Sequence, residues 1–179
     1  MSFRPDETIT TERLTLRPPT IDDAGAIFDA YAQDPDVTRH TNWAPHASIE
    51  VTREFLGEAI DAWSGNARFV WVVGDKASGE LVGGLETRLE AHRAEVGFVF
   101  RRSTWGKGFA TEATGALIEH VFSRPEMRRM FAYCHVDNAA SVRVLEKCGM
   151  KRERRVHRGC VFPNLSEEPQ DVFLYAITR

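Results

Sequence analysis

The stretch that most constrains the fold is WGKGFATEATGALIEHVF, from Trp105 to Phe122, in which two glycines stand directly before a helical pattern. A run typical of a strand, AEVGFVF, comes shortly before it. The segment therefore predicts a strand, a tight turn and a helix in direct succession. One face of that helix carries apolar residues at steps of three and four: Ala110, Ala113, Leu117, Ile118 and Val121.

The glycines allow two interpretations of this turn. Gly106 and Gly108 have no Cβ, so their N–H groups can approach a ligand closely, and the first N–H groups of the helix lack intrahelical partners. Together with Lys107 they would form a cradle for a pyrophosphate. The other interpretation is a plain turn at the start of a helix. Neither the Walker loop nor the G-x-G-x-x-G dinucleotide loop is present.

The rest of the chain alternates between strand and helix patterns. ERLTLRP reads as a strand, and a helix follows from Thr20, where Thr20 and Asp23 have capping-box spacing. A second helix is predicted after Ser48, and RFVWVVG and ELVGGLE form a hairpin in which Gly83 and Gly84 suggest a bulge or a close backbone approach.

The C-terminal third continues this alternation. FAYCHV is predicted as a strand and NAASVRVLEKCG as a helix, capped by Asn138 and ended by Gly149. RERRVHRG and DVFLYAIT are two last strands around a loop, CVFPNLSEEPQ. The order β-α-α-β-β-β-α-β-α-β-β predicts one mixed α/β domain over residues 1–179.

Composition narrows the class of protein. The 179 residues are 42% hydrophobic and 27% charged, as in soluble globular domains. There is no apolar run of ~18 residues and no signal-peptide core in MSFRPDETIT, so we expect a cytoplasmic protein that binds no membrane. Three cysteines without C-x-x-C spacing and six scattered histidines predict neither a disulfide framework nor a metal site.

Charge is distributed unevenly along the chain. The net charge of -3 gives no general attraction to nucleic acid. Residues 1–90 carry 8 Lys/Arg against 16 Asp/Glu, whereas residues 91–179 carry 15 against 10. The basic half contains the glycine turn, which favours a site for a polyanionic small molecule, although a solvated basic face is the alternative.

WGKGFATEA resembles the acyl-CoA-binding segment of the GNAT superfamily of N-acetyltransferases, whose pattern is Q/R-x-x-G-x-G/A. Trp105 takes the Q/R place, Gly108 the first glycine and Ala110 the last position. Trp105 departs from the superfamily pattern, but W-G-K-G is familiar in the RimJ/RimL-like branch of ribosomal-protein N-terminal acetyltransferases. TERLTLRPPTIDDA, VDNAASVRVLEKCGMKRE and PNLSEEPQDVFLYA resemble the same branch, so the resemblance covers about residues 10–178.

The resemblance implies a mostly antiparallel sheet in which two parallel strands splay apart around acetyl-CoA. These strands would be AEVGFVF and FAYCHV, with flanking helices. Asn138 would contact the pantetheine arm, besides capping its helix, and Ser141 would donate a proton to the departing CoA thiolate. The backbone contacts to the cofactor would come from Phe98, Val99 and Phe100 on the strand and from Trp105, Gly106, Lys107, Gly108, Phe109, Ala110 and Thr111 in the turn.

The reaction needs a neutral amine. A protein α-amine has a pKa near 7.7–8.0 and is partly neutral near neutral pH, so a base acting through water suffices. Glu95, on the strand beside the cofactor, is the first candidate for that base, and an ordinary ion pair is its alternative role. Glu86 is the second candidate, and His135 and His157 are further ones.

The acceptor pocket is expected between the first two helices, their loop and the C-terminal loop. Its candidate residues are Trp43, His46, Glu86, Phe162, Asn164 and Glu168.

Four functions remain open at this stage. The first is acetylation of a protein N-terminal α-amine, and the second is acetylation of a small amine such as an amino acid, polyamine or antibiotic. The third is a non-catalytic acyl-CoA-binding module, and the fourth a generic phosphate-binding domain. Relatives of this type occur as monomers or homodimers.

Overall fold

The computed structural model describes residues 7–65 and 68–179. Residues 1–6, which are part of the N-terminal segment predicted not to be a signal peptide, lie outside the described residues. In the described ranges, no helix has the length and apolar character needed to span a membrane.

The described strands form one open sheet of eight strands in the order β1-β2-β3-β4-β5-β6-β8-β7. All neighbours pair antiparallel except β5 and β6, which are parallel. This confirms the predicted mixed sheet. The strands are β1 (Ile9–Thr10), β2 (Leu14–Arg17), β3 (Arg68–Asp75), β4 (Leu81–Glu90), β5 (Arg93–Phe100), β6 (Arg129–His135), β7 (Lys151–Phe162) and β8 (Ser166–Thr178).

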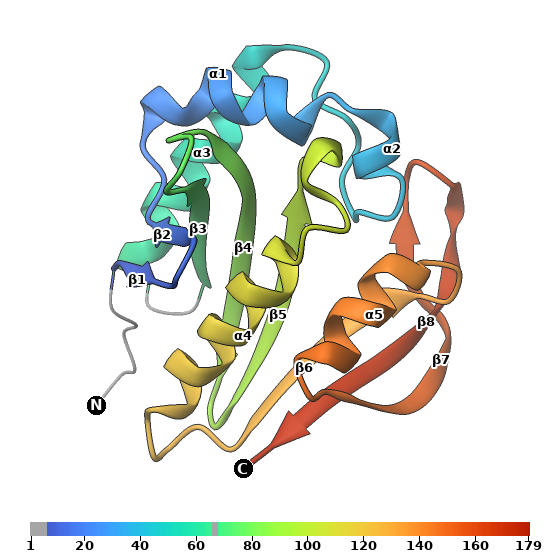
Figure 1. The fold of residues 1–179 in the computed structure, drawn as a ribbon. Coiled ribbons are helices and arrows are strands. Elements are labelled where there is room, and N and C mark those ends of the chain that lie inside the picture. Colours follow the sequence, from blue (N-terminus) through green and yellow to red (C-terminus); the bar gives the residue numbers. More distant parts are fainter. Residues whose placement is uncertain (1–6, 66–67) are drawn as a thin grey trace.

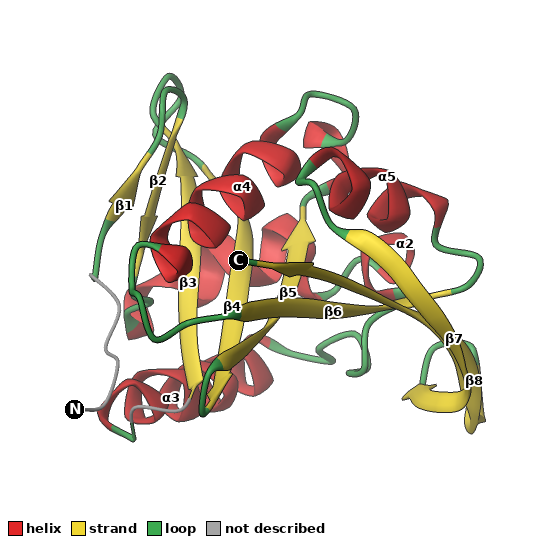
Figure 2. Cartoon of the chain, turned by 90° about the horizontal axis from the view of Figure 1, so that it is seen from below, coloured by secondary structure: helices red, strands yellow, loops and turns green. Residues whose placement is uncertain are grey.

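Helices cover both faces of the sheet (Figure 2). One face packs against α4, and the other packs against α1 and α3. The helical segments are η1 (Ile21–Asp23), α1 (Ala24–Ile27), η2 (Phe28–Ala32), α2 (Pro35–Thr38), α3 (Ile49–Ser64), η3 (Arg102–Thr104), α4 (Phe109–Phe122) and α5 (Ala139–Lys147).

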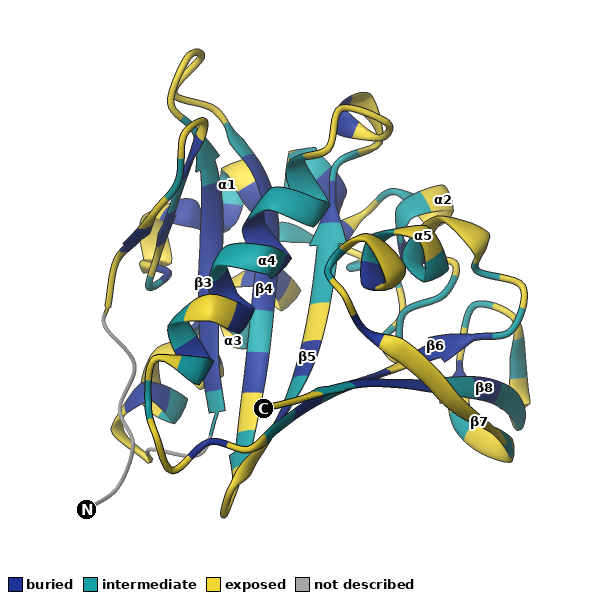
Figure 3. Ribbon diagram, turned by 60° about the horizontal axis from the view of Figure 1, so that its bottom comes forward, coloured by how far each residue is buried: buried dark blue, intermediate teal, exposed yellow. Residues whose placement is uncertain are grey.

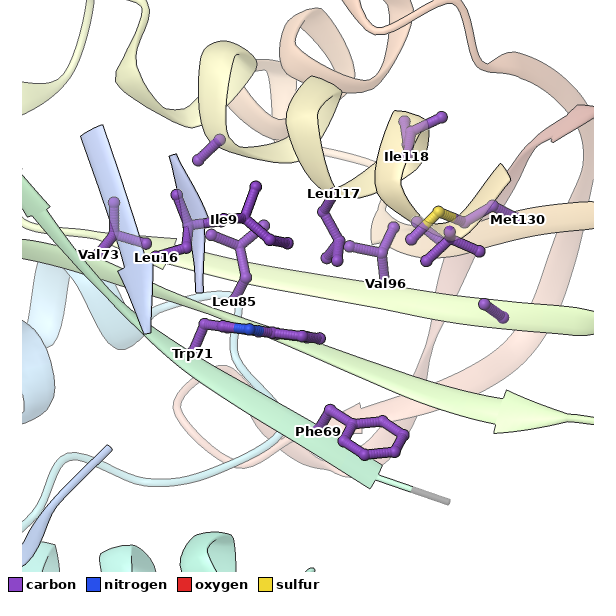
Figure 4. Packing of buried hydrophobic residues seen from close by; sticks show 14 of the residues in the cluster. Ile9, Leu16, Phe69, Trp71, Val73, Leu85, Val96, Leu117, Ile118 and Met130 are labelled. Atoms are coloured by element: carbon purple, nitrogen blue, oxygen red, sulfur yellow. The ribbon is translucent and has the colours of Figure 1, made fainter. Parts of the chain in front are cut away.

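The main core lies between α4 and the middle of the sheet (Figure 4). Leu117 of α4 is fully buried near Leu85 of β4 and Val96 of β5, and Met130 of β6 is also buried. Burying such side chains stabilises the fold by roughly 1.5–3 kcal/mol each. The helix that follows the glycine turn is therefore fixed firmly on the sheet.

The parallel strands β5 and β6 separate, as the resemblance implied (Figure 1). They pair at three positions, Arg93 with Arg129, Ala94 with Met130 and Glu95 with Phe131. After these pairs β5 continues to Phe100 beside β4 alone. The sheet therefore opens into a V at the C-terminal ends of β5 and β6.

Several local predictions are confirmed. Thr20 and Asp23 form the capping box, and Gly149 ends α5 with a φ of 80°. At Gly83 of β4, an added Cβ would lie 2.5 Å from the Val99 carbonyl oxygen, so this glycine marks the expected close approach.

The C-terminal loop prediction is wrong. Most of CVFPNLSEEPQ is strand, because β7 runs to Phe162 and β8 starts at Ser166, leaving three residues as the turn. Most of β7 is exposed (Figure 3), so its sequence lacks the apolar alternation that reveals a half-buried strand. The short β1 and α2 were not predicted either.

Replacing Asp23 with Asn should destabilise the fold by about 2 kcal/mol near neutral pH, because Asp23 accepts charge-assisted hydrogen bonds in a buried position. Its carboxylate accepts from Arg17 Nη2 at 2.6 Å, Arg17 Nη1 at 2.9 Å and Thr20 N at 2.7 Å. Burial alone would raise the pKa of Asp23, but these donors outweigh it and hold the pKa below its ordinary value. The depressed pKa means that the stabilisation is present above the unfolded pKa and is lost as the pH falls through the folded one.

Urea unfolding at near-neutral pH and at about pH 3 measures this difference. Asp22→Asn is the control, because Asp22 is exposed one position earlier. A penalty for Asp23→Asn that is equally large in acid would contradict the assignment to the ionised carboxylate.

Candidate active site

A cavity of about 280 Å³ opens within the V between β5 and β6. The end of β5, the turn before α4, one side of α5 and the α2 segment enclose it. Eleven of the residues predicted for the cofactor line it: Phe98, Val99, Phe100, Trp105, Gly106, Gly108, Phe109, Ala110, Thr111, Asn138 and Ser141.

The glycine turn has the conformation that its composition suggested. Gly106 and Gly108 have φ angles of 77° and 83°, in the left-handed region that favours glycine. Five backbone N–H groups of this turn and of the start of α4 have no acceptor among the described residues. They belong to Gly106, Gly108, Phe109, Ala110 and Thr111. These donors and the N-terminal end of the α4 dipole make this turn a site for an anion.

Two cations of α5 face the same cavity. Arg143 and Lys147 line it, and neither has a carboxylate partner within the described ranges. The expected cation of the turn, Lys107, does not line the cavity. The positive charge of the site therefore comes from α5 rather than from the glycine turn.

Asn138 and Ser141 lie together at the start of α5. The Asn138 side-chain oxygen accepts a hydrogen bond from Ser141 N at 3.1 Å, so Asn138 does cap the helix. Because both residues also line the cavity, the cap leaves the Asn138 amide nitrogen and the Ser141 hydroxyl available to a ligand.

Glu95 lies on the other face of the sheet from α4. Its neighbours Ala94 and Val96 pack into the α4 core, so the alternation of β5 directs Glu95 away from it. Burial raises the pKa of the Glu95 carboxyl, with Arg88 opposing and Glu86 adding to the shift. Glu95 does not line the cavity, but it occupies the last β5 position before the V opens.

Glu86, the second candidate base, is held by two guanidinium groups. Its carboxylate contacts Arg68 Nη2 at 2.8 Å and Arg88 Nη2 at 2.7 Å. The Arg68 guanidinium lies 5.9 Å from the centre of the Phe55 ring. Because both ion pairs occupy the Glu86 carboxylate, Glu95 is the better placed of the two.

Two of the expected acceptor residues, Trp43 and Asn164, lie beside the α2 segment, but none of the six lines the cavity. Asn164 Nδ2 donates to the carbonyl oxygens of Thr38, at 2.5 Å, and Trp43, at 3.0 Å, which joins the β7–β8 turn to the loop after α2. Phe162 is buried with its ring 5.0 Å from that of His135. Phe162 therefore packs against His135 and does not line the cavity.

The remaining candidates are engaged elsewhere. His46 Nδ1 lies 2.8 Å from Thr52 Oγ1, and Glu168 pairs with Arg158. His157, on the exposed β7, lies 3.0 Å from Asp171 of β8. His135 Nδ1 accepts a hydrogen bond from Asp137 N at 3.1 Å.

The sequence analysis missed the contribution of α2 and of His40 and Thr41, which come shortly after it. His40 lines the cavity with its ring stacked 4.9 Å from that of His135, and burial is the largest of the effects that lower its pKa. No periodic signal marks a four-residue helix. The lining residues that were not predicted are Asp36, Val37, His40, Thr41, Thr104, Ala140, Arg143, Val144 and Lys147.

Comparisons with known proteins agree with this geometry. The family profile described as acetyltransferase (GNAT) domain matches residues 13–151. The uncharacterized N-acetyltransferase p20 of Bacillus licheniformis is 34% identical over 152 residues, which cover 82% of this chain and 84% of that protein.

Solved structures share the whole fold. A GNAT-family acetyltransferase from Bacillus anthracis superposes with a TM-score of 0.83 at 28% identity, covering 96% of this chain and 98% of that one. RimL, a ribosomal α-N-protein acetyltransferase solved with coenzyme A, gives a TM-score of 0.85 over 96% and 98% of the two chains. Its 22% identity makes it evidence of fold alone.

Proposed function

The chain belongs to the GNAT family of N-acetyltransferases, and on this premise we propose that it transfers the acetyl group of acetyl-CoA to a protein N-terminal α-amine. The observation that carries the proposal is the cavity in the V, lined by the left-handed glycine turn on one side and Ser141 on the other. The protein acceptor is chosen by analogy with RimL, a ribosomal α-N-protein acetyltransferase that has the same fold.

The residues present fit acetyl-CoA. The unpaired N–H groups of the Gly106–Thr111 turn suit a pyrophosphate, and Arg143 and Lys147 supply positive charge beside it. Backbone groups of Phe98 and Val99, which have no partner strand on the β6 side, suit the amides of a pantetheine arm. Acetyl-CoA supplies an acetyl group activated as a thioester.

Three side chains would then transfer protons and orient the bound cofactor. Glu95 accepts the amine proton through water, which its raised pKa favours. The Ser141 hydroxyl donates a proton to the leaving thiolate, and Asn138 orients the pantetheine carbonyl with its amide nitrogen. An α-amine needs only this modest help because much of it is neutral near neutral pH.

Release of CoA thiol from acetyl-CoA tests the proposal with matched acceptors. Peptides beginning with Ala or Ser should be acetylated, whereas the same peptides with a formylated N-terminus and an internal lysine should not. Free amino acids, polyamines and aminoglycosides form the second panel. If only the compounds of the second panel are acetylated, the acceptor is a small amine and not a protein N-terminus. Acetyl-CoA binding with no turnover on any acceptor would favour a non-catalytic module.

A further inference from the structure

Arg13, directly before β2, contacts the glycine turn from its outer side. Its Nη1 donates to the Lys107 carbonyl oxygen at 3.0 Å. Its guanidinium carbon lies 4.6 Å from the centre of the Phe109 ring, and its Nη2 lies 3.4 Å from where a Cβ of Gly108 would stand. One side chain therefore touches three consecutive residues of the turn.

Glu112, in the first turn of α4, fixes this arginine. Its Oε2 accepts from Arg13 Nε at 2.6 Å, while Oε1 accepts from Arg13 N at 2.9 Å and from Thr11 Oγ1 at 2.5 Å. Burial alone would raise the pKa of Glu112, but these donors hold it below its ordinary value. The ion pair thus ties the start of α4 to the β1–β2 connection, about a hundred residues away in sequence.

The geometry leads us to infer that Arg13 and Glu112 are positioning residues that keep the glycine turn preformed for a pyrophosphate. The inference rests on the proposed use of acetyl-CoA. A turn with two left-handed glycines is costly to order, so a turn ordered in advance binds its ligand more tightly. Arg13 does not line the cavity and binds the Lys107 carbonyl oxygen, whereas Gly106 and Gly108 line the cavity and their N–H groups have no acceptor among the described residues.

Arg13→Lys and Glu112→Gln test the inference with two ligands. Both variants should bind acetyl-CoA about tenfold more weakly by calorimetry, because each removes charge-assisted hydrogen bonds that fix the turn. Both should bind S-acetylpantetheine, which has no pyrophosphate, within about twofold of wild type by NMR titration. Glu153→Gln is the matched control: it breaks an equally short ion pair, Arg129–Glu153 at 2.6 Å, and should change neither affinity.

Each outcome bears on the inference. An equal loss of affinity for both ligands would overturn the inference, because the ion pair would then stabilise the domain in general. Unchanged affinity for acetyl-CoA would overturn it as well. If Glu112→Gln does not fold by circular dichroism, the charge-conserving Arg13→Lys decides alone. Wild type that binds acetyl-CoA no better than S-acetylpantetheine would refute the proposed pyrophosphate site itself.

Discussion

Replacing Glu95 with Gln will lower kcat by about 100-fold, the usual contribution of a general base, without destabilising the protein near neutral pH. Glu95 is half-buried at the last paired position before β5 and β6 separate. Its raised pKa means that the ionised carboxylate is less stable in the folded protein than in the unfolded chain. Removing that charge while keeping the shape therefore leaves the free energy of unfolding unchanged or higher.

The pH dependence of kcat/KM separates this role from a general loss of activity. The wild-type rate should rise with pH through the raised pKa of Glu95, because the base works only when deprotonated. Glu95→Gln should lose this acid limb and keep only the rise due to the acceptor amine. Glu86→Gln should keep the limb, since Arg68 and Arg88 already hold the Glu86 carboxylate. An acid limb that persists in Glu95→Gln would assign the base elsewhere.

Replacing Gly83 with Ala should cost about 3 kcal/mol of stability, in the range of severe overpacking. The new Cβ would lie 2.5 Å from the Val99 carbonyl oxygen and 2.6 Å from the Phe100 ring, and a backbone oxygen cannot turn aside as a side chain can. Because Val99 and Phe100 line the cavity, relief of the clash should also weaken acetyl-CoA binding.

Gly97→Ala is the control for this change. Gly97 lies on β5, the strand that carries Val99 and Phe100, and an added Cβ there meets nothing within 4 Å. Urea unfolding and calorimetry should find this variant close to wild type. A Gly83→Ala protein as stable as wild type would show that β4 and β5 can part at this point without cost.

The sequence predicted the features that depend on local geometry. The glycine turn, the α4 helix behind it and the Asn138 cap follow from residue types at neighbouring positions. The α2 segment beside the cavity could not be predicted in this way, because a helix of four residues forms only with tertiary support. Arg102 provides some of it through ion pairs with Asp34, at 2.9 Å, and Asp36, at 2.6 Å.

The surroundings of Glu95 could not be predicted either. Burial in the folded sheet raises the pKa of Glu95, and the β4–β5 register places Arg88 where it opposes that rise. The ion pair between Arg13 and Glu112 could not be predicted for the same reason, because it depends on the tertiary fold. TERLTLR and GFATEA each suggest a local structure, but only folding brings these two segments together.

The three residue pairs between β5 and β6 have a mechanical consequence. Among the described strands, these pairs are the only ones that join the first five strands, β1–β5, to the last three, β6, β8 and β7. The two parts of the sheet are joined only along this short stretch, and the cavity lies just beyond it. Residues of β5 line the cavity on one side and residues of α5 line it on the other. A ligand bound there would contact both parts of the sheet, so its binding would also stabilise their arrangement relative to each other.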